Sequence, residues 1–138
     1  MKFILFFLIL FVTGFSMIAQ TPADYLLQKW IKVASGDPYN GTDISPIDTI
    51  KYKSTTQFLP NGSFFTIDNW NHKTGKWKWN DDSTKIGMYH TRINEDVIDD
   101  KPNSEVNMII IKLTKDSLIL GWQGPHGIVR EIYVKTTN

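Results

Sequence analysis

The chain of 138 residues has no cysteine, only three histidines and almost no excess of charge of either sign. Without cysteine there are no disulfide bonds, no thiolate metal sites, no cysteine nucleophile and no thiol for a lipid anchor. The 15 basic and 14 acidic residues nearly cancel, so the basic field typical of nucleic-acid and membrane-surface binders is missing. We therefore expect no lipid anchor, no nucleic-acid partner and a fold held together by packing alone.

The longest apolar run lies at the N-terminus. Ten apolar residues, Phe3–Val12, follow the single positive charge of Lys2, and small or polar residues then lead up to Ala19. This order is typical of a secretory signal peptide, and it predicts cleavage after Ala19 or Gln20. A membrane span needs about 20 predominantly apolar residues, and this segment is interrupted before it reaches that length. We therefore expect a periplasmic or secreted protein with no stable membrane anchor after cleavage.

Residues 20–138 alternate short strand-like segments with turn-forming residues. In Gly75–Trp79, two tryptophans fall on one face and two lysines on the other, as expected for a half-buried strand. Asn61-Gly62 is a strong signal for a tight hairpin turn. The predicted strands are Lys29–Ala34, Thr49–Leu59, Phe64–Asp68, Gly75–Trp79, Thr84–His90, Glu105–Leu113, Leu118–Trp122 and Ile128–Lys135.

These eight segments predict a single all-β domain. A short helical turn is expected within Ala23–Trp30, a long irregular loop over Ser35–Asp48, and no segment is long enough for a crossover helix. Successive hairpins are typical of an antiparallel up-and-down barrel or a sandwich, and closure into a barrel removes the exposed edges. About 118 residues after cleavage suffice for one modest core.

Four motifs, in this order, resemble those of bacterial lipocalin-like domains. They are Leu26–Trp30 (similar to L-x-G-x-W), Gln57–Phe64 (F-x-x-D/N-G-T/S-F), Gly75–Trp79 (G-x-W) and Leu113–Leu120 (L-T-x-D-S-L-x-L). Their order and spacing match over nearly the whole of residues 20–138. Gln28 replaces the usual glycine, and the loop after Gly36 is longer than the pattern. The resemblance implies a calyx-like barrel with an apolar interior.

No pattern of catalytic or metal-binding residues emerges. His72, His90 and His126 lack the short spacing of metal ligands, and the carboxylate pairs Asp81-Asp82 and Asp99-Asp100 are adjacent, so strand geometry would point them to opposite faces. There is no G-x-S-x-G elbow and no glycine-rich phosphate loop. We expect no enzyme, no metal and no cofactor. His90 is expected either inside the barrel or at its rim.

Apolar side chains at period two predict the lining of the barrel. The predicted lining residues are Phe65, Ile67, Trp77, Trp79, Met88, Met108, Leu118, Leu120 and Trp122. Small eight-stranded barrels either hold one small ligand or pack solid, and both remain open at this point.

In the last predicted strand, alternation places the charged Arg130 on the same face as Ile128, Ile132 and Val134. In lipocalins, an arginine late in the barrel stacks on the N-terminal tryptophan. The resemblance implies that Arg130 and Trp30 are these two residues here and that their contact closes the barrel. The contact would be a cation–π interaction. The alternative is that this face of the strand is exposed to solvent.

Two functions fit this sequence. The first is an exported binding protein that holds a small hydrophobic ligand inside the barrel. The second is an inhibitor or immunity-type factor, with a filled barrel whose loops bind another exported protein. A cavity of several hundred cubic ångströms lined by aromatic side chains favours the first, and an exposed apolar loop patch on a solid barrel favours the second.

Overall fold

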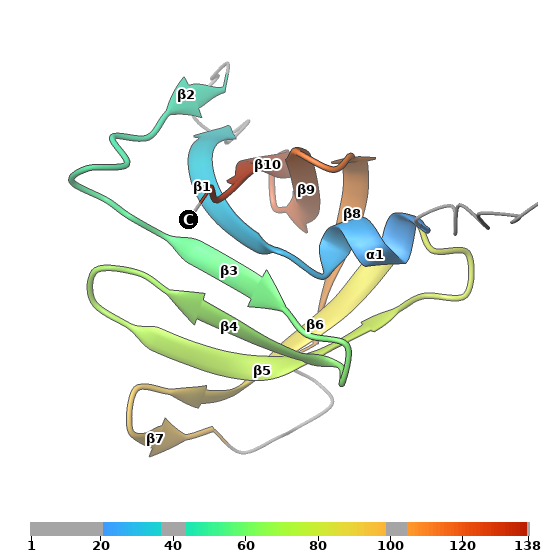
Figure 1. Cartoon of the computed structure of the whole chain (residues 1–138), viewed down its shortest axis with the longest axis horizontal. Coiled ribbons are helices and arrows are strands. Elements are labelled where there is room, and N and C mark those ends of the chain that lie inside the picture. Colours follow the sequence, from blue (N-terminus) through green and yellow to red (C-terminus); the bar gives the residue numbers. More distant parts are fainter. Residues whose placement is uncertain (1–20, 37–43, 99–104, 138) are drawn as a thin grey trace, which may run out of the picture.

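The computed structural model describes residues 21–36, 44–98 and 105–137, so the predicted signal peptide lies outside the described residues. Eight strands of four to nine residues, two strands of two residues and one short helix make up the fold (Figure 1). They are α1 (Pro22–Leu26), β1 (Lys29–Gly36), β2 (Ser45–Pro46), β3 (Thr55–Phe58), β4 (Ser63–Ile67), β5 (His72–Trp79), β6 (Lys85–Ile93), β7 (Asp96–Val97), β8 (Val106–Leu113), β9 (Ser117–Gly124) and β10 (Gly127–Lys135).

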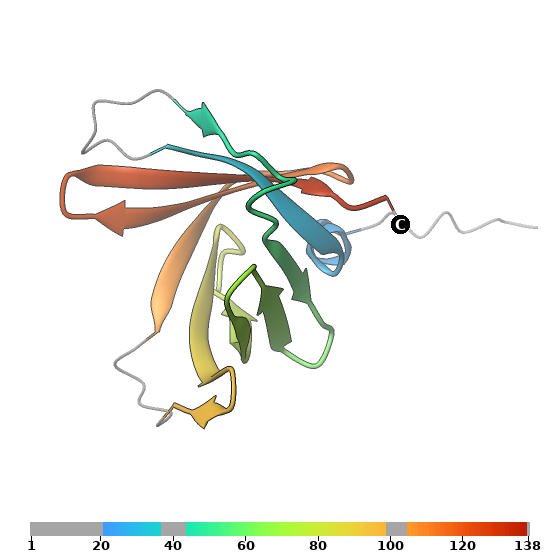
Figure 2. The same cartoon turned by 90° about the vertical axis from the view of Figure 1, so that its left-hand side faces the viewer.

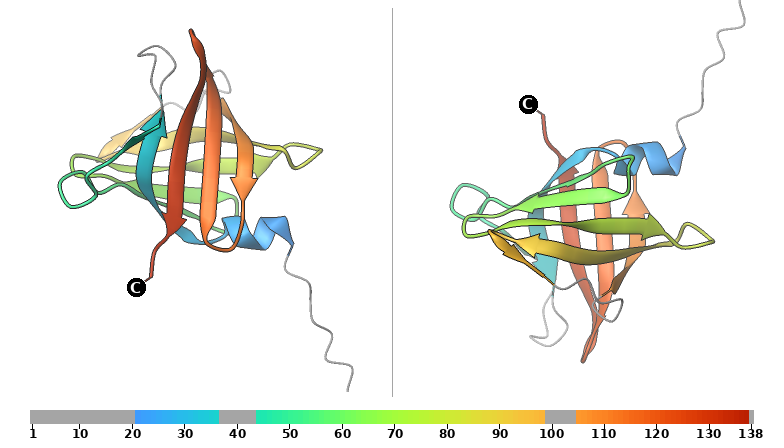
Figure 3. Two further views of the ribbon diagram at one scale, coloured as in Figure 1. Left: turned by 90° about the horizontal axis from the view of Figure 1, so that it is seen from above. Right: turned by 90° about the horizontal axis from the view of Figure 1, so that it is seen from below.

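The eight longer strands form a closed antiparallel barrel. Each pairs with the next along the chain, in the order β1-β3-β4-β5-β6-β8-β9-β10, and β10 returns to pair with β1. Figures 2 and 3 show β1, β10, β9 and β8 crossing the remaining strands, which gives the barrel a flattened, two-sided shape. The predicted all-β barrel with a short N-terminal helix is confirmed.

The largest departure from the predicted elements is the segment before β3. The sequence predicts a strand over Thr49–Leu59, but only Thr55–Phe58 pairs in the sheet. The Asp48 side chain accepts hydrogen bonds from the backbone N–H groups of Ile50 (3.0 Å) and Lys51 (3.2 Å). An aspartate that bonds the backbone two and three residues ahead favours a turn over an extended strand.

The core lies at the end of the barrel that α1 covers, beside the β8–β9 hairpin (Figure 3). Trp30 and Leu26 have no exposed surface, and the Trp30 indole Nε1 donates a hydrogen bond to the Leu26 carbonyl (3.1 Å). This bond ties the helix to β1 across the barrel end. The remaining buried members are Phe58, Phe64, Trp77, Ile86, Met108, Leu118, Leu120 and Tyr133.

Two glycines permit this packing. Gly62 has a φ of +76° in the β3–β4 turn, a conformation that glycine adopts without strain. On β5, a side chain at Gly75 would meet the Phe64 ring and the Tyr89 carbonyl at 2.5 and 2.2 Å. Glycine at this position therefore lets the Phe64 ring lie directly against the β5 backbone.

Candidate functional site

A cavity of about 370 Å³ lies inside the barrel, beyond the core packed under α1. On β6, Ile86 is fully buried in the core, whereas Met88 and His90, two and four residues further along the same face, line the cavity. The barrel is therefore filled at one end and hollow at the other. The lining consists of Lys32, Ser54, Thr56, Phe58, Phe64, Thr66, Asp68, Lys73, Met88, His90, Val106, Met108, Leu120, Trp122, Glu131 and Tyr133.

The wall formed by β6, β8 and β9 is apolar. Met88, Met108, Leu120 and Trp122 line it. Met108 and Leu120 belong to the buried core, and Met88 and Trp122 pack against that core. Methionine adapts its shape to irregular ligands, and a tryptophan offers a large flat contact area. This wall suits the hydrocarbon or aromatic part of a small molecule.

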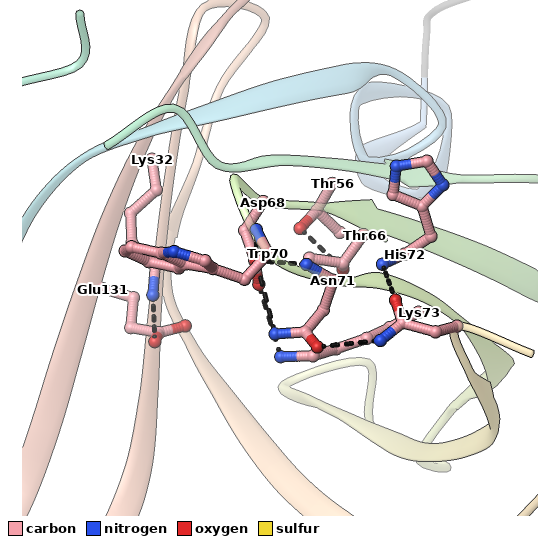
Figure 4. A network of polar contacts seen from close by, with 10 residues as sticks. Lys32, Thr56, Thr66, Asp68, Trp70, Asn71, His72, Lys73 and Glu131 are labelled. Atoms are coloured by element: carbon pink, nitrogen blue, oxygen red, sulfur yellow. Dashed lines mark hydrogen bonds and ion pairs between the residues drawn. The ribbon is translucent and has the colours of Figure 1, made fainter. Parts of the chain in front are cut away.

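The opposite wall carries an ion pair between β1 and β10 (Figure 4). Lys32 Nζ lies 2.6 Å from Glu131 Oε1, and the Tyr133 hydroxyl donates to Glu131 Oε2 at 2.6 Å. Burial raises the pKa of Tyr133 well above its usual range, and the neighbouring Glu131 charge and hydrogen bond raise it further. The Tyr133 phenol therefore stays protonated and holds the Glu131 carboxylate in place.

A second ion pair joins the end of β4 to β5. Lys73 Nζ lies 3.4 Å from Asp68 Oδ2, and Asp68 Oδ1 accepts the backbone N–H groups of Trp70 (2.9 Å) and Asn71 (2.8 Å). Burial alone would raise the pKa of Asp68, but these two backbone hydrogen bonds and the Lys73 charge outweigh it and lower the pKa. Asp68 is therefore a stable carboxylate at neutral pH.

Uncharged polar groups complete this wall. The Thr56 and Thr66 hydroxyls lie 3.0 Å apart on β3 and β4. His90 lies on β6 where the apolar wall meets β5 of the polar wall, and its ring packs edge-on against Phe64, with 5.3 Å between ring centroids. Burial, and secondarily the Lys73 charge, lowers the pKa of His90, so the imidazole is neutral at pH 7. With both lysines paired to carboxylates and His90 neutral, the cavity has no net charge.

Of the predicted lining residues, Met88, Met108, Leu120 and Trp122 lie in the cavity wall. Trp77 and Leu118 are buried in the core beneath it, and Trp79 is half-buried against that core. The Trp77 ring contacts Phe58 edge-on, with 5.6 Å between centroids.

The prediction that Phe65 and Ile67 line the barrel is wrong. These side chains are 41% and 47% exposed on the outer face of β4, and Phe64 and Thr66 point inward. The β3–β4 turn pairs Phe58 with Phe64, and this register determines which face of β4 is buried. Because Phe64 and Phe65 are adjacent and equally apolar, alternation alone does not distinguish the two faces.

The predicted closure by Arg130 and Trp30 is also wrong. Trp30 pairs with Lys135, whereas Arg130 pairs with Gly36 at the far end of β1, roughly 20 Å away along the strand. Arg130 is exposed together with Ile128 and Val134, which matches the solvent-facing alternative.

The polar wall is not among the features predicted from the sequence. Lys32 shares a strand face with Trp30 and Ala34, and Glu131 shares one with Tyr133, so both charges alternate in phase with residues that are buried. Opposite charges at inward-facing positions of the first and last strands of a barrel therefore indicate an internal ion pair.

The described residues contain no group of three side chains that could hold a metal ion. Within the same part of the chain, no helix is long and apolar enough to cross a membrane. No known family model matches the chain, and no curated protein sequence matches it.

A solved structure does match. The crystal structure of a lipocalin-like protein from Bacteroides uniformis superposes with a TM-score of 0.57, covering 81% of this chain and 99% of that protein, at 17% sequence identity. The fold is lipocalin-like. The resemblance of the four motifs is thereby confirmed at the level of the fold, and the barrel interior described above corresponds to the calyx that the motifs implied.

Proposed function

We propose that this protein is an exported binding protein that holds a small, largely hydrophobic molecule in the barrel cavity. The lipocalin-like barrel is generally a binding fold, and the cavity of about 370 Å³ falls within the range of small-molecule sites. The single observation that carries the proposal is the division of this cavity into an apolar and a polar wall. Each charge on the polar wall already has a partner, so the ligand need not be charged inside the barrel.

A bulky side chain at Met88 tests where the ligand lies. Met88 is in the cavity wall, so tryptophan in its place should fill part of the hollow and weaken binding by about ten-fold or more, equivalent to 1.4 kcal/mol. N-phenylnaphthylamine, a neutral fluorescent probe, measures this by titration.

Tyr89→Trp is the matched control. It adds a tryptophan one residue further along β6, and residue 89 pairs with the exposed Lys76 on the outer face of the sheet. Tyr89 is half-buried and does not line the cavity, so we expect probe affinity within about two-fold of the native protein. Equal loss of affinity in both variants would contradict binding inside the barrel.

Export is the second part of the proposal, and the N-terminal sequence supports it. Expressed in a bacterial host, the protein should be recovered outside the cytoplasm beginning at Gln20 or Thr21, since signal peptidase removes the preceding segment. N-terminal sequencing of the periplasmic and culture fractions measures this. An intact Met1 in a membrane fraction would contradict it.

A further inference from the structure

A second hollow of about 210 Å³ adjoins the cavity at its open end. Lys32, Ser54 and Asp68 line both hollows, so the two adjoin at these three residues. We call it the vestibule. Its lining consists of Lys32, Ile47, Tyr52, Lys53, Ser54, Asp68, Asn69 and Trp70.

Two aromatic rings form a platform on the vestibule. Trp70 is 71% exposed and Tyr52 is 42% exposed, and their ring centroids lie 6.0 Å apart at a tilt of 41°. Because the two rings already contact each other, a ligand would lie on them rather than between them. Large exposed aromatic side chains beside a cavity favour stacking with a flat ring.

The platform is held by hydrogen bonds rather than by burial. Asp68 accepts the Trp70 backbone N–H at 2.9 Å, and the Tyr52 backbone N–H donates to the Asp48 carbonyl at 2.7 Å. The Asn69 side-chain amide donates to the Lys51 carbonyl and so links the two turns. Because both turns are already ordered, less conformational entropy of the protein is lost when a ligand binds.

The charge of the vestibule is positive, in contrast to the neutral cavity. Lys32, Lys53 and Asp68 are its charged lining residues, and the Lys53 ammonium group has no hydrogen bond or ion pair within the described part of the chain. Lys51 is outside the lining but adds a positive charge nearby, with its Nζ 5.0 Å from the Tyr52 ring centroid. The carboxylate of Asp68 is already engaged by Lys73 and two backbone N–H groups. An anionic group on the ligand would therefore meet an available cation at Lys53.

We infer that the ligand is a planar anion: a flat ring system that stacks on Tyr52 and Trp70, with a carboxylate, sulfonate or phosphate at Lys53 and an apolar part inside the barrel. This inference rests on the proposed function and adds the chemical class of the ligand. The apolar wall selects the part inside, and the vestibule selects the charge and the flat shape.

Two probes that share one ring system test the charge. Anilinonaphthalene sulfonate is N-phenylnaphthylamine with one added sulfonate. We expect the sulfonate to bind about ten-fold more tightly than the neutral probe. Because the vestibule is open to solvent, this advantage should shrink as salt screens the charge. Fluorescence titrations of the native protein at low and high salt measure both effects.

Lys53→Met tests the residue that supplies the charge. We expect it to remove most of the advantage of the sulfonate probe over the neutral probe, about five-fold or more. Lys76→Met is the matched control, because Lys76 is an exposed lysine on the outer face of β5. Equal effects of the two substitutions would overturn the assignment of the anion to Lys53.

Trp70→Ala tests the platform. Affinity for both probes should fall by about five- to ten-fold, in line with the loss of one ring-stacking contact, and Trp70→Phe should restore most of it. Since Trp70 is 71% exposed in a turn, the alanine variant should fold normally. Unchanged affinity in Trp70→Ala would overturn stacking on the platform.

The outcomes separate the two proposals. If the neutral probe binds and depends on Met88, but the sulfonate adds no affinity, the planar-anion inference fails and the proposed function stands. If both probes bind but neither depends on Met88, the proposed function fails. If neither probe binds, both fail.

Discussion

Replacing Trp30 by alanine should lower the free energy of unfolding by about 3–5 kcal/mol, a large share of the total stability of a domain of this size. Trp30 has no exposed surface and lies at the centre of the closed end, in contact with the fully buried Leu26. The strands around it are joined by the barrel's hydrogen bonds, so they cannot collapse into the space left behind. Urea unfolding followed by circular dichroism measures the loss.

Trp30→Phe separates packing from hydrogen bonding. Phenylalanine retains much of the apolar volume but cannot donate to the Leu26 carbonyl, which the indole reaches at 3.1 Å. The Leu26 carbonyl keeps the hydrogen bond from the Gln28 backbone N–H (2.7 Å), so the substitution removes one hydrogen bond, which contributes about 0.5–1.5 kcal/mol. We therefore expect a smaller but distinct loss of stability. A Trp30→Ala variant within about 1 kcal/mol of the native protein would contradict the assignment of Trp30 to the core.

Replacing Trp77 by alanine should have an effect of similar size, about 3–5 kcal/mol. Only 9% of Trp77 is exposed, its ring packs edge-on against Phe58 and Trp79, and its Nε1 donates to the Leu59 carbonyl at 3.1 Å. Trp79 is half-buried, so Trp79→Ala should be less costly. Urea unfolding of each single variant measures the order.

The lysines of the same strand are matched controls. Lys76 and Lys78 are exposed on the other face of β5, and their replacement by alanine should change stability by less than about 0.5 kcal/mol. Lys78 pairs with Glu105 at 3.2 Å, but its side chain is 68% exposed, and exposed ion pairs contribute little. Equal losses for the tryptophans and the lysines would contradict the face assignment of β5.

The order of the strands follows from local chemistry and was predicted from the sequence. Asn61-Gly62 and the other turn signals separate the segments, and the regular alternation in Gly75–Trp79 specifies one buried face. A strand with a polar residue at every second position can be buried on only one side. For this reason, the sequence places Trp77 in the interior and Lys76 outside without any knowledge of the partner strands.

Where alternation was ambiguous, the face of a strand depended on its neighbours. Phe64 and Phe65 are indistinguishable by local pattern, and the hairpin register with Phe58 buries the first and exposes the second. On β10, the charges of Arg130 and Glu131 alternate with apolar residues on both faces, and pairing with β1 and β9 turns Glu131 inward.

The candidate site brings together residues that are far apart in the sequence and that meet only when the barrel closes. Lys32 and Glu131 are 99 residues apart and lie side by side only because β10 returns to β1. The vestibule likewise joins the turn before β3 to the β4–β5 turn through the link between Asn69 and Lys51. Periodicity describes each strand relative to its own axis, whereas a binding site depends on the distances between strands, which arise only when the barrel closes.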